Sequence, residues 1–391
     1  MLRQSCRGCV VTSPIVDGGD PVPLVSTNGG AFLGPSLPLS YLYRCTLRSL
    51  ALALSRLMAT AAPSGPARIA VIGAAWWAQG WHIPHLVRNP DAELVAIVQR
   101  SEQPTAAAFL NLTLKTKTQL VEEYNVPMFS SCEELLEDSE LMGKLDGVII
   151  CTAHSCHSWM GKMFLDAGKH IFMEKPMTVD VEEARLLAAQ ATEAKVAFMV
   201  NNTANFRAQC FEARRIVERG DIGDINHVLC VMYSPLLFLF DDPANDGWVK
   251  PTGSMVQPDG SGNGFGWGQS SHVLAWVLGV GGLDAVEVTA MTHRSESSGA
   301  DLTDAALIRC QTARGNLCSI SFSAGCCWPG NQYGDHPTGK HFDIKMFGTK
   351  GVLMYGGDDK DPASGRLEVR YHDGDKAPFV SEGFLMENGD P

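Results

Sequence analysis

The chain has 391 residues, which is enough for two or three domains of ordinary size. Hydrophobic residues make up 45% of it and charged residues 19%, a composition typical of a globular protein and too apolar for a disordered one. The formal net charge of -12, without a long basic block, argues against nucleic acid as a partner, because binding phosphates requires a basic surface. No stretch reaches the roughly 18 apolar residues of a membrane span, so no membrane partner is expected. The cysteines do not follow a metal-binding spacing, so no metal site is expected.

Residues 1–66 differ in composition from the rest of the chain. They are rich in Ser, Pro and Gly, contain arginine but no lysine, and have only Asp17 and Asp20 as acids. This composition is typical of an organelle transit peptide, although a start at Met58 would leave most of the segment untranslated. We therefore expect 1–66 to be a disordered or transit-peptide-like extension. The protein is expected to be cytoplasmic if translation starts at Met58, and organellar, in a mitochondrion or plastid, if the extension is genuine.

Between residues 67 and 200, short apolar runs alternate with helical segments. The runs are predicted to be buried strands at 68–73, 93–98, 145–152, 171–173 and 197–200. Strands that alternate with helices usually pack as a parallel sheet with helices on both faces. Residues 67–200 are therefore predicted to form a Rossmann-type, doubly wound α/β domain that binds a dinucleotide.

The first of these strands runs into a turn with part of a dinucleotide-binding pattern. The G-x-G-x-x-G positions are Gly73, Ala75 and Ala78, so only the first glycine is kept. A tight turn can still form at Gly73, and free N–H groups at the start of the following helix can hold a phosphate. We predict cofactor contacts at Gly73, Ala75, Trp76 and Trp77.

The end of the second strand bears on the choice of cofactor. An acid at this point would bond the ribose 2′-hydroxyl of NAD, whereas an arginine suits the 2′-phosphate of NADP. The chain has Gln99, Arg100 and Ser101 there. NADP is therefore favoured and NAD remains possible, with Arg100 and Ser101 as predicted contacts; the alternative is that Arg100 only faces solvent.

Polar residues also follow the third and fourth strands. Thr152 ends the third and His157 follows it. Glu174 and Lys175 follow the fourth, which must stop at Pro176 because proline cannot donate to a sheet. Open α/β sheets bind ligands beyond the carboxyl ends of their strands, so these residues are predicted to contact the cofactor. A lysine at such a position can donate a proton or hold negative charge, because burial and neighbouring charges readily change its pKa. An ordinary surface lysine is the alternative.

The pattern of apolar residues changes near residue 225. Strand-like runs separated by turn residues follow at 228–233, 286–292, 305–311, 317–322 and 342–347. Residues 319–323 alternate strictly between Ser and apolar residues, which predicts one buried face and one face that is polar or covered by a partner. Residues 201–391 are therefore predicted to form an α+β domain with an open-faced, mostly antiparallel sheet. A glycine-rich loop at 241–268 leads into a predicted helix at 269–278.

Taken together, these features resemble the Gfo/Idh/MocA family of oxidoreductases, from about Arg68 to Gly351. The matching segments are the Gly73 turn, His157, Gly168-Lys169-His170 leading to Glu174-Lys175-Pro176, Asn205-Phe206-Arg207 before Gly220-x-x-Gly223, His272, and Phe347-Gly348-Thr349-Lys350-Gly351. Members of the family join a nucleotide-binding domain to an open-faced antiparallel sheet and end in a further helix. The resemblance therefore implies that this chain is shortened at its C-terminus and that its second domain is incomplete.

The resemblance also implies an activity: an NAD(P)-dependent dehydrogenase or reductase acting on a hydroxyl or keto carbon of a sugar, cyclitol or similar polyol. Lys175 would orient the substrate and tune proton transfer, and His272 would take the hydroxyl proton as the hydride leaves. Lys175, His272 and the polar residues Asn202, Asn205 and Arg207 are the predicted substrate contacts.

Two departures from the family pattern keep other functions open. Aspartates usually stand four residues before and three residues after the histidine, but here these positions are Gly268 and Ala275. One alternative is a non-catalytic NAD(P)-binding sensor or scaffold protein. The other is a glycosidase of the same family that uses tightly held NAD transiently. In each case an open sheet face is expected to be covered by a second copy, which predicts a homo-oligomer formed through the C-terminal sheet.

Overall fold

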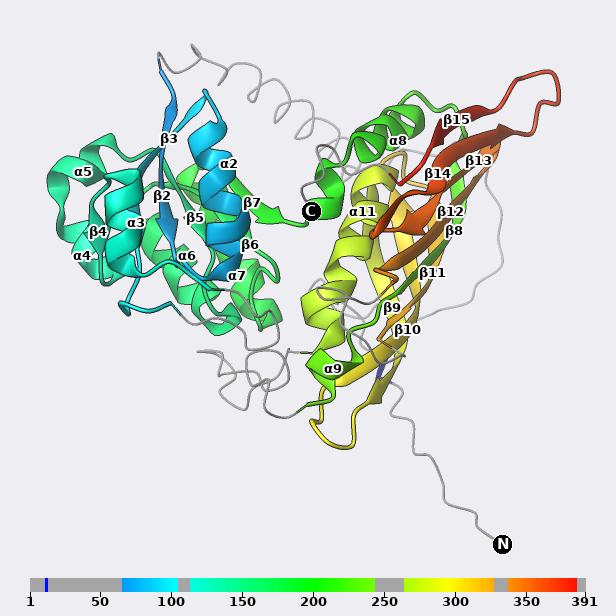
Figure 1. The fold of residues 1–391 in the computed structure, drawn as a ribbon. Helices are drawn as coiled ribbons and strands as arrows, with labels where there is room; N and C mark the ends of the chain where they lie inside the picture. The colour runs from blue at the N-terminus through cyan, green and yellow to red at the C-terminus, as the bar shows by residue number, and fades with distance from the viewer. Residues whose placement is uncertain (1–10, 13–64, 105–112, 243–263, 327–336, 385–391) are drawn as a thin grey trace, which may run out of the picture. The chain divides into compact units, whose positions relative to one another are not determined.

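A computed structural model describes residues 11–12, 65–104, 113–242, 264–326 and 337–384 (Figure 1). Most of the predicted N-terminal extension and most of the glycine-rich loop lie outside the described residues. The described part contains two β-sheets.

The first sheet is parallel and lies in the N-terminal half. Its strand order is β4-β3-β2-β5-β6-β7, and every pair with a recorded register is parallel. Its strands are β2 (Ala67–Ile72), β3 (Ala92–Val98), β4 (Met128–Phe129), β5 (Gly147–Ile150), β6 (His170–Glu174) and β7 (Phe198–Asn201). The strand order reverses between β2 and β5, and ligands of open α/β sheets bind beyond the carboxyl ends of the strands at such a point.

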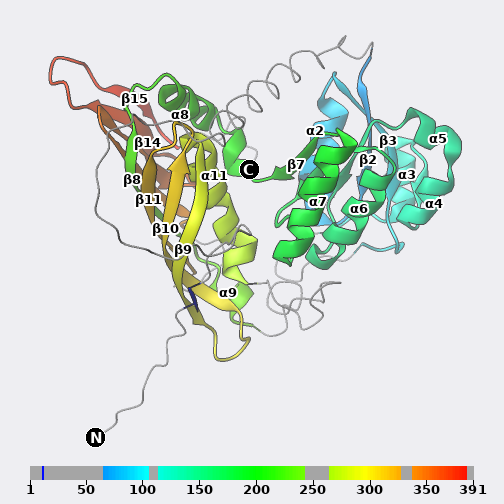
Figure 2. The same ribbon diagram turned by 180° about the vertical axis from the view of Figure 1, so that it is seen from behind.

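Helices cover both faces of this sheet, as the two opposite views show (Figures 1 and 2). They are the π-helix η1 (Ala78–His82), α2 (Ile83–Arg88), α3 (Lys117–Tyr124), α4 (Cys132–Glu137), α5 (Ser139–Lys144), the 3₁₀-helix η3 (His154–Cys156), α6 (His157–Asp166) and α7 (Val181–Ala194). Val71 of β2 packs in one hydrophobic cluster with Ile83 of α2 and Leu120 of α3. The next residue, Ile72, packs in another cluster with Leu187 of α7. Because successive side chains of a strand point to opposite faces, the sheet is doubly wound, as the sequence predicted.

The second sheet is mostly antiparallel. Its strand order is β1-β9-β10-β11-β8-β12-β13-β14-β15, and only β8 and β11 pair in parallel. Its strands are β1 (Val11–Thr12), β8 (Ile225–Tyr233), β9 (Leu283–Arg294), β10 (Asp301–Thr312), β11 (Leu317–Gly325), β12 (His341–Gly348), β13 (Gly351–Asp358), β14 (Asp361–Tyr371) and β15 (Phe379–Glu382). This confirms the predicted fold class for the second half.

One face of the second sheet is covered by helix α11. The helices of this half are the 3₁₀-helix η4 (Thr203–Phe206), α8 (Ala208–Glu218), α9 (Leu237–Phe240), the π-helix η5 (Gly266–Ser270) and α11 (Ser271–Gly281). Trp276 of α11 is buried and stacks on Tyr355 of β13, with ring centroids 4.6 Å apart and planes inclined by 4°. The predicted helix at 269–278 therefore exists, but it continues from a π-helical turn that starts at Gly266. None of the described helices is both long and apolar enough to span a bilayer.

The other face of the second sheet carries exposed apolar side chains. Met291, Leu307 and Leu317 are 65%, 56% and 62% exposed. They share this face because directly paired residues point to the same side: Met291 pairs with Ala305, and Leu307 pairs with Ser321. The sheet is therefore open-faced, as predicted.

The predicted shortening of the second domain is not borne out. Three strands, β13, β14 and β15, extend the sheet beyond the last predicted strand. Strand β14 was not predicted because it has no apolar run. The buried Leu367 and Val369 alternate with the charged residues Arg366, Glu368 and Arg370. Charged residues of this kind are usual near the edge of a sheet, where they discourage further pairing.

Candidate functional site

The turn after β2 forms the first part of the site. Gly73 has a φ of +90°, and its N–H donates to the carbonyl oxygen of Val98 over 2.8 Å. A Cβ atom at Gly73 would clash with the carbonyl oxygen of Cys151 and lie 2.8 Å from Cγ2 of Thr152. Only glycine therefore allows this turn to pack against the end of β5. The fold thus brings together two predicted cofactor contacts, Gly73 and Thr152.

The residues after the turn present aromatic side chains and backbone N–H groups. Trp77 stacks on Trp81 with ring centroids 4.2 Å apart, and Trp76 meets Trp77 edge-on at 5.1 Å. The indole Nε1 of Trp77 is buried and has no hydrogen-bond partner among the described residues. The N–H of Ala74 donates to Oε1 of Gln99 over 3.0 Å. Gln99 therefore links the turn to the end of β3, a role that the sequence did not suggest.

The end of β3 carries an exposed arginine. Arg100 and Ser101 are both exposed, and the hydroxyl of Ser101 donates to the carbonyl oxygen of Gln103 over 2.8 Å. The nearest acid in the chain, Glu102, accepts a hydrogen bond of 3.1 Å from the N–H of Thr118, which lowers the pKa of its carboxyl group. Glu102 is thereby held at the start of α3. Arg100 is the charged group that faces outward at this strand end.

A buried hydrogen-bond network holds the end of β6. The carboxylate of Glu174 accepts from Nδ2 of Asn201 over 2.6 Å and from the N–H of Lys175 over 3.1 Å, and it lies 2.7 Å from Nε2 of His82. Burial raises the pKa of Glu174, but the contacts with His82, Asn201 and Lys175 outweigh it and lower the pKa overall. Glu174 was predicted as a cofactor contact; its carboxylate joins β6, β7 and η1.

His82 and Asn201 are site residues that the sequence reasoning missed. The one available signal was that Asn201 ends β7, at the same edge of the sheet as Glu174, whereas His82 ends the π-helix η1. Nothing local in the sequence shows that they converge on one carboxylate.

His157 is buried between two loops. Its Nδ1 lies 2.8 Å from the carbonyl oxygen of Pro176, and its Nε2 lies 3.3 Å from that of Thr152. Burial lowers the pKa of His157, so the ring is neutral and carries one N–H. His157 therefore ties the loop after β5 to the residue that follows Lys175. It thereby helps to fix the end of β6, where Lys175 stands, and its contact with the cofactor stays a prediction.

Lys175 projects from the end of β6 toward the second half of the chain. Its Nζ donates a hydrogen bond of 2.8 Å to the carbonyl oxygen of Gly268 in η5. Burial, followed by the positive charge of Lys340, lowers the pKa of Lys175 to about 8, against the opposing effect of Glu174. Both the charged and the neutral lysine are therefore accessible near neutral pH.

His272 lies in the first turn of α11 and is 6% exposed. Its pKa is well below the usual histidine value because of burial and the positive charges of Lys340, Lys175 and Arg207. The imidazole is therefore neutral at physiological pH. Its Nδ1 has no hydrogen-bond partner among the described residues. The structure thus brings together the two predicted catalytic residues, Lys175 and His272.

Several buried polar groups that follow Asn201 or precede His272 in the chain have no hydrogen-bond partner among the described residues. Burying a polar group unpaired costs about 1–3 kcal/mol, so such groups usually mark a place where a ligand or water binds. Within the described part of the chain, the unpaired atoms are Oδ1 of Asn202 and Asn205, both amide atoms of Gln269, and the hydroxyls of Ser270 and Ser271. Asn202 and Asn205 were predicted substrate contacts, whereas Gln269 was not.

Arg207 is the remaining predicted substrate contact. Its guanidinium lies over the ring of Phe384 at 4.3 Å and over that of Phe342 at 5.7 Å, and it donates to the hydroxyl of Tyr355 over 3.3 Å. These rings hold a cation whose charge acts on His272. No contact among the described residues joins Arg100 or Ser101 to this group.

Comparison with known proteins agrees with this fold. Residues 67–202 match the oxidoreductase family with an NAD-binding Rossmann fold, GFO/IDH/MocA, and residues 211–354 match the C-terminal domain of the same family. Among curated proteins, the chain is 30% identical over 105 residues to inositol 2-dehydrogenase of Rhizobium meliloti, which covers 27% of this chain and 32% of that protein. The aligned segment thus spans about a third of the relative's length.

Solved structures share the fold over a longer part of the chain. The WlbA dehydrogenase from Bordetella pertussis, in complex with NADH and UDP-GlcNAcA, matches with a TM-score of 0.57 and 20% identity over 76% of this chain and 75% of its own. KijD10, a 3-ketoreductase from Actinomadura kijaniata in complex with NADP and TDP-benzene, matches with a TM-score of 0.56 and 19% identity over 82% and 85%. At these identities the likeness is one of fold.

Proposed function

Because the chain belongs to the Gfo/Idh/MocA family of NAD(P)-binding oxidoreductases, we propose that it transfers a hydride between the nicotinamide and a hydroxyl or keto carbon of a polyol. The observation that carries the proposal is the pairing of Lys175, whose pKa is lowered to about 8, with a neutral, buried His272. Perturbed titratable groups of this kind cluster at catalytic sites. Sugars and cyclitols are the substrates that we propose.

The residues at the carboxyl ends of β2 and β3 fit a dinucleotide. The turn at Gly73, with Ala75, Trp76 and Trp77 after it, would hold the pyrophosphate, and the unpaired Nε1 of Trp77 is a donor available to a ligand. The nicotinamide, when bound, supplies the hydride chemistry.

We propose NADP as the favoured cofactor, with NAD as the alternative. Arg100 is exposed at the end of β3, and Glu102, the acid that could bond a ribose 2′-hydroxyl, is engaged by Thr118. Arg100 and Ser101 would therefore contact a 2′-phosphate. The 2′-phosphate contacts are expected to be salt-sensitive, since Arg100 is exposed.

The two residues at the reacting carbon have separate roles in this proposal. Neutral His272 takes the proton of the substrate hydroxyl during oxidation and returns it during reduction. The ammonium of Lys175 donates a hydrogen bond to the same oxygen and stabilises the charge that develops there. The network of Glu174, His82 and Asn201 holds the backbone of Lys175, and His157 holds the residue after it.

The remaining polar groups would bind the other hydroxyls of the substrate. The side-chain amides of Asn202, Asn205 and Gln269 have atoms that lack partners among the described residues. An amide can both donate and accept, which matches a hydroxyl group. Several such unpaired amides support a polyhydroxylated ligand over an apolar one.

Turnover by the purified protein tests this function. We would follow formation of NADPH and NADH with a panel of aldoses, uronic acids, sugar phosphates and cyclitols. Lys175→Ala should abolish turnover while cofactor binding, measured by fluorescence, is retained. Lys162→Ala is the matched control, because Lys162 is exposed on α6 and pairs only with Asp166 among the described residues. Cofactor binding without turnover on any substrate would contradict the dehydrogenase proposal.

A non-catalytic NAD(P)-binding sensor or scaffold is the second candidate. It is favoured by Gly268 and Ala275, which stand where the family places aspartates around the histidine. A glycosidase that uses NAD transiently is a third, and release of a sugar without net cofactor reduction would identify it.

A further inference from the structure

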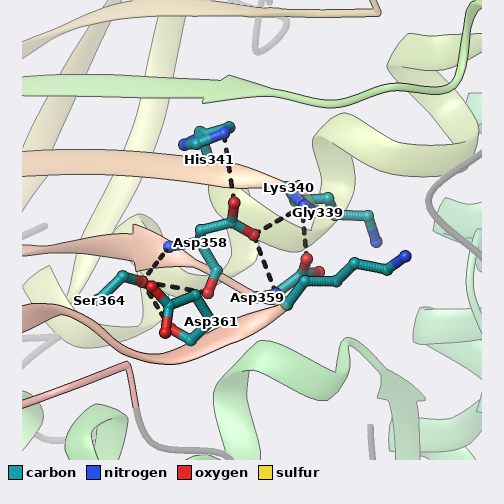
Figure 3. A network of polar contacts seen from close by, with 8 residues as sticks. Gly339, Lys340, His341, Asp358, Asp359, Asp361 and Ser364 are labelled. Atoms are coloured by element: carbon teal, nitrogen blue, oxygen red, sulfur yellow. Dashed lines mark hydrogen bonds and ion pairs between the residues drawn. The ribbon is translucent and has the colours of Figure 1, made fainter. Parts of the chain in front are cut away.

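Lys340 lies immediately before β12, in a segment that the sequence did not single out. Its backbone is held by two carboxylates at the turn between β13 and β14 (Figure 3). The N–H of Lys340 donates to Oδ1 of Asp359 over 2.6 Å, and the N–H of Asp359 donates back to the carbonyl oxygen of Lys340 over 3.0 Å. The preceding N–H, from Gly339, donates to Oδ1 of Asp358 over 2.7 Å. The position of Lys340 is therefore set by paired backbone contacts.

Asp358 is itself held on several sides. It is 8% exposed, its carboxylate also accepts from the N–H of Lys360 over 2.9 Å, and its own N–H donates to the hydroxyl of Ser364 over 2.8 Å. A Cβ atom at Gly339 would overlap Oδ1 of Asp359 and lie 2.8 Å from Oδ1 of Asp358. The close approach of the two segments thus requires glycine. Such a tightly braced turn is well suited to present one side chain in a fixed direction.

The side chain of Lys340 does not join this network. In Figure 3 it extends away from the carboxylates of Asp358 and Asp359, and none of the drawn contacts reaches its ammonium. Within the described part of the chain, its Nζ has no hydrogen bond or ion pair. The two carboxylates are instead bonded to backbone N–H groups. The network therefore positions the lysine and leaves its charge available.

The ammonium of Lys340 acts on the candidate site. Phe342, two residues after Lys340 and therefore on the same face of the sheet, lies under the guanidinium of Arg207 at 5.7 Å. Arg207 also donates to Tyr355, whose ring stacks on Trp276, one helical turn after His272. In agreement with this placement, the charge of Lys340 lowers the pKa of both Lys175 and His272. Burial, followed by repulsion from Arg207, lowers the pKa of Lys340, against attraction by Asp359. Three cations, Lys175, Arg207 and Lys340, thus share one partly buried region. Like charges in such a region repel one another, and a bound anion would relieve the repulsion.

We propose that Lys340 binds an acidic group of the substrate, so that the preferred substrate is an anionic polyol. This inference rests on the proposed function of the same site and names its substrate class. The acidic group can be a carboxylate, as in a sugar acid, or a phosphate, as in a sugar phosphate; both offer the charged oxygen that an ammonium binds. Gln269 and the asparagines at 202 and 205 would bind the hydroxyl groups of the substrate, while the ammonium of Lys340 would bind its acidic group.

The test compares substrates that carry an acidic group with related substrates that are uncharged. Wild-type protein with NADP and with NAD is assayed with uronates and aldonates, with their uncharged amides, with sugar phosphates, and with the parent neutral sugars. We expect an acid to be the best substrate and its amide to lose about tenfold to a hundredfold in kcat/KM, the usual effect of one charge-assisted hydrogen bond. The carboxylate and phosphate series separate the two sources of the anion.

Lys340→Met removes the charge and keeps most of the side-chain volume. This variant should reduce the preference for the acid over its amide to less than about threefold, mainly through a higher KM for the acid. Lys340→Arg should retain the preference. Lys345→Met is the matched control, because Lys345 lies on the same strand and pairs with Asp343 at the surface.

Three results would overturn the inference. One is a neutral polyol as the best substrate, with the same kcat/KM in Lys340→Met. Another is an equal loss on acid and amide, which would show that Lys340 has only a structural role. The third is that titration calorimetry detects no binding of any acid to the cofactor-loaded protein. If acids bind in a Lys340-dependent manner but none is turned over, the anion site stands and the proposed activity fails.

Discussion

The ammonium of Lys175 donates a hydrogen bond of 2.8 Å to the backbone carbonyl of Gly268. Gly268 stands four residues before His272, where the family resemblance places an aspartate, so this position offers a backbone carbonyl and no carboxylate. A carbonyl can orient the ammonium but does not neutralise it. Burial, followed by the positive charge of Lys340, lowers the pKa of Lys175 against the opposing effect of Glu174.

The first prediction concerns the pH dependence of turnover. The pKa of Lys175 is about 8, so its ammonium is charged below this pH and loses its proton above it. If the ammonium stabilises the reacting oxygen, kcat/KM should fall above about pH 8. In Lys175→Arg, whose side chain remains charged, the fall in kcat/KM should move to higher pH or disappear. A flat profile between pH 7 and 10 in the wild type would contradict the assigned role.

The second prediction concerns His272. Its pKa lies well below the usual histidine value, so the base form persists as the pH falls through 6.5. Oxidation should therefore show no loss near pH 6.5. His272→Asn should lower kcat by roughly 10²–10⁴ with little change in cofactor affinity. His227→Asn is the control, because His227 bonds Ser319 in the second sheet; equal effects of the two changes would refute the assignment.

The third prediction concerns the buried carboxylate of Glu174. Glu174→Gln should lower the free energy of unfolding by about 1.5–3 kcal/mol, the range for hydrogen bonds to a charged group. Because the folded pKa of Glu174 is lowered, its contribution is present above the unfolded pKa near 4.3 and is lost as the pH falls through the folded pKa.

Urea unfolding at pH 7 and at pH 3 measures this difference, which should be smaller at pH 3. Glu193→Gln, at an exposed position of α7, is the control and should change stability little. An unchanged urea midpoint for Glu174→Gln at pH 7 would mean that the network does not stabilise the fold.

The fourth prediction concerns cofactor choice. Arg100→Glu should raise KM for NADP by about tenfold to a hundredfold, because it removes a charge-assisted bond to the 2′-phosphate. The same change should leave KM for NAD similar or lower. Arg185→Glu, on the exposed face of α7, serves as the control. Equal changes in KM for NADP and NAD would show that Arg100 does not contact the 2′-phosphate.

The fifth prediction concerns assembly. We propose that a second copy covers the open face of the second sheet, where Met291, Leu307 and Leu317 are exposed. The double change Met291→Asp and Leu307→Asp should then yield monomers in sedimentation experiments. Leu186→Asp, at an exposed position of α7, should leave assembly unchanged. A monomeric wild-type protein would contradict the proposal.

The sequence by itself determined the architecture and its main landmarks. Apolar runs that alternate with helices predict the parallel sheet, because the period of burial is a local property. Gly73 marked the tight turn and Pro176 marked the strand end that presents Lys175, because glycine and proline restrict the backbone wherever they stand. The resemblance added His272, and the structure places it beside Lys175.

Only the tertiary structure decided which groups meet. His82 and Glu174 are 92 residues apart, and Lys175 and Gly268 are 93 apart, so their contacts depend on how helices and strands pack. Lys340 carried no local signal at all, since its role follows from a turn braced by Asp358 and Asp359 and from its position near His272. Local patterns encode elements, whereas the charge environment of a site arises from side chains that the packed fold brings together.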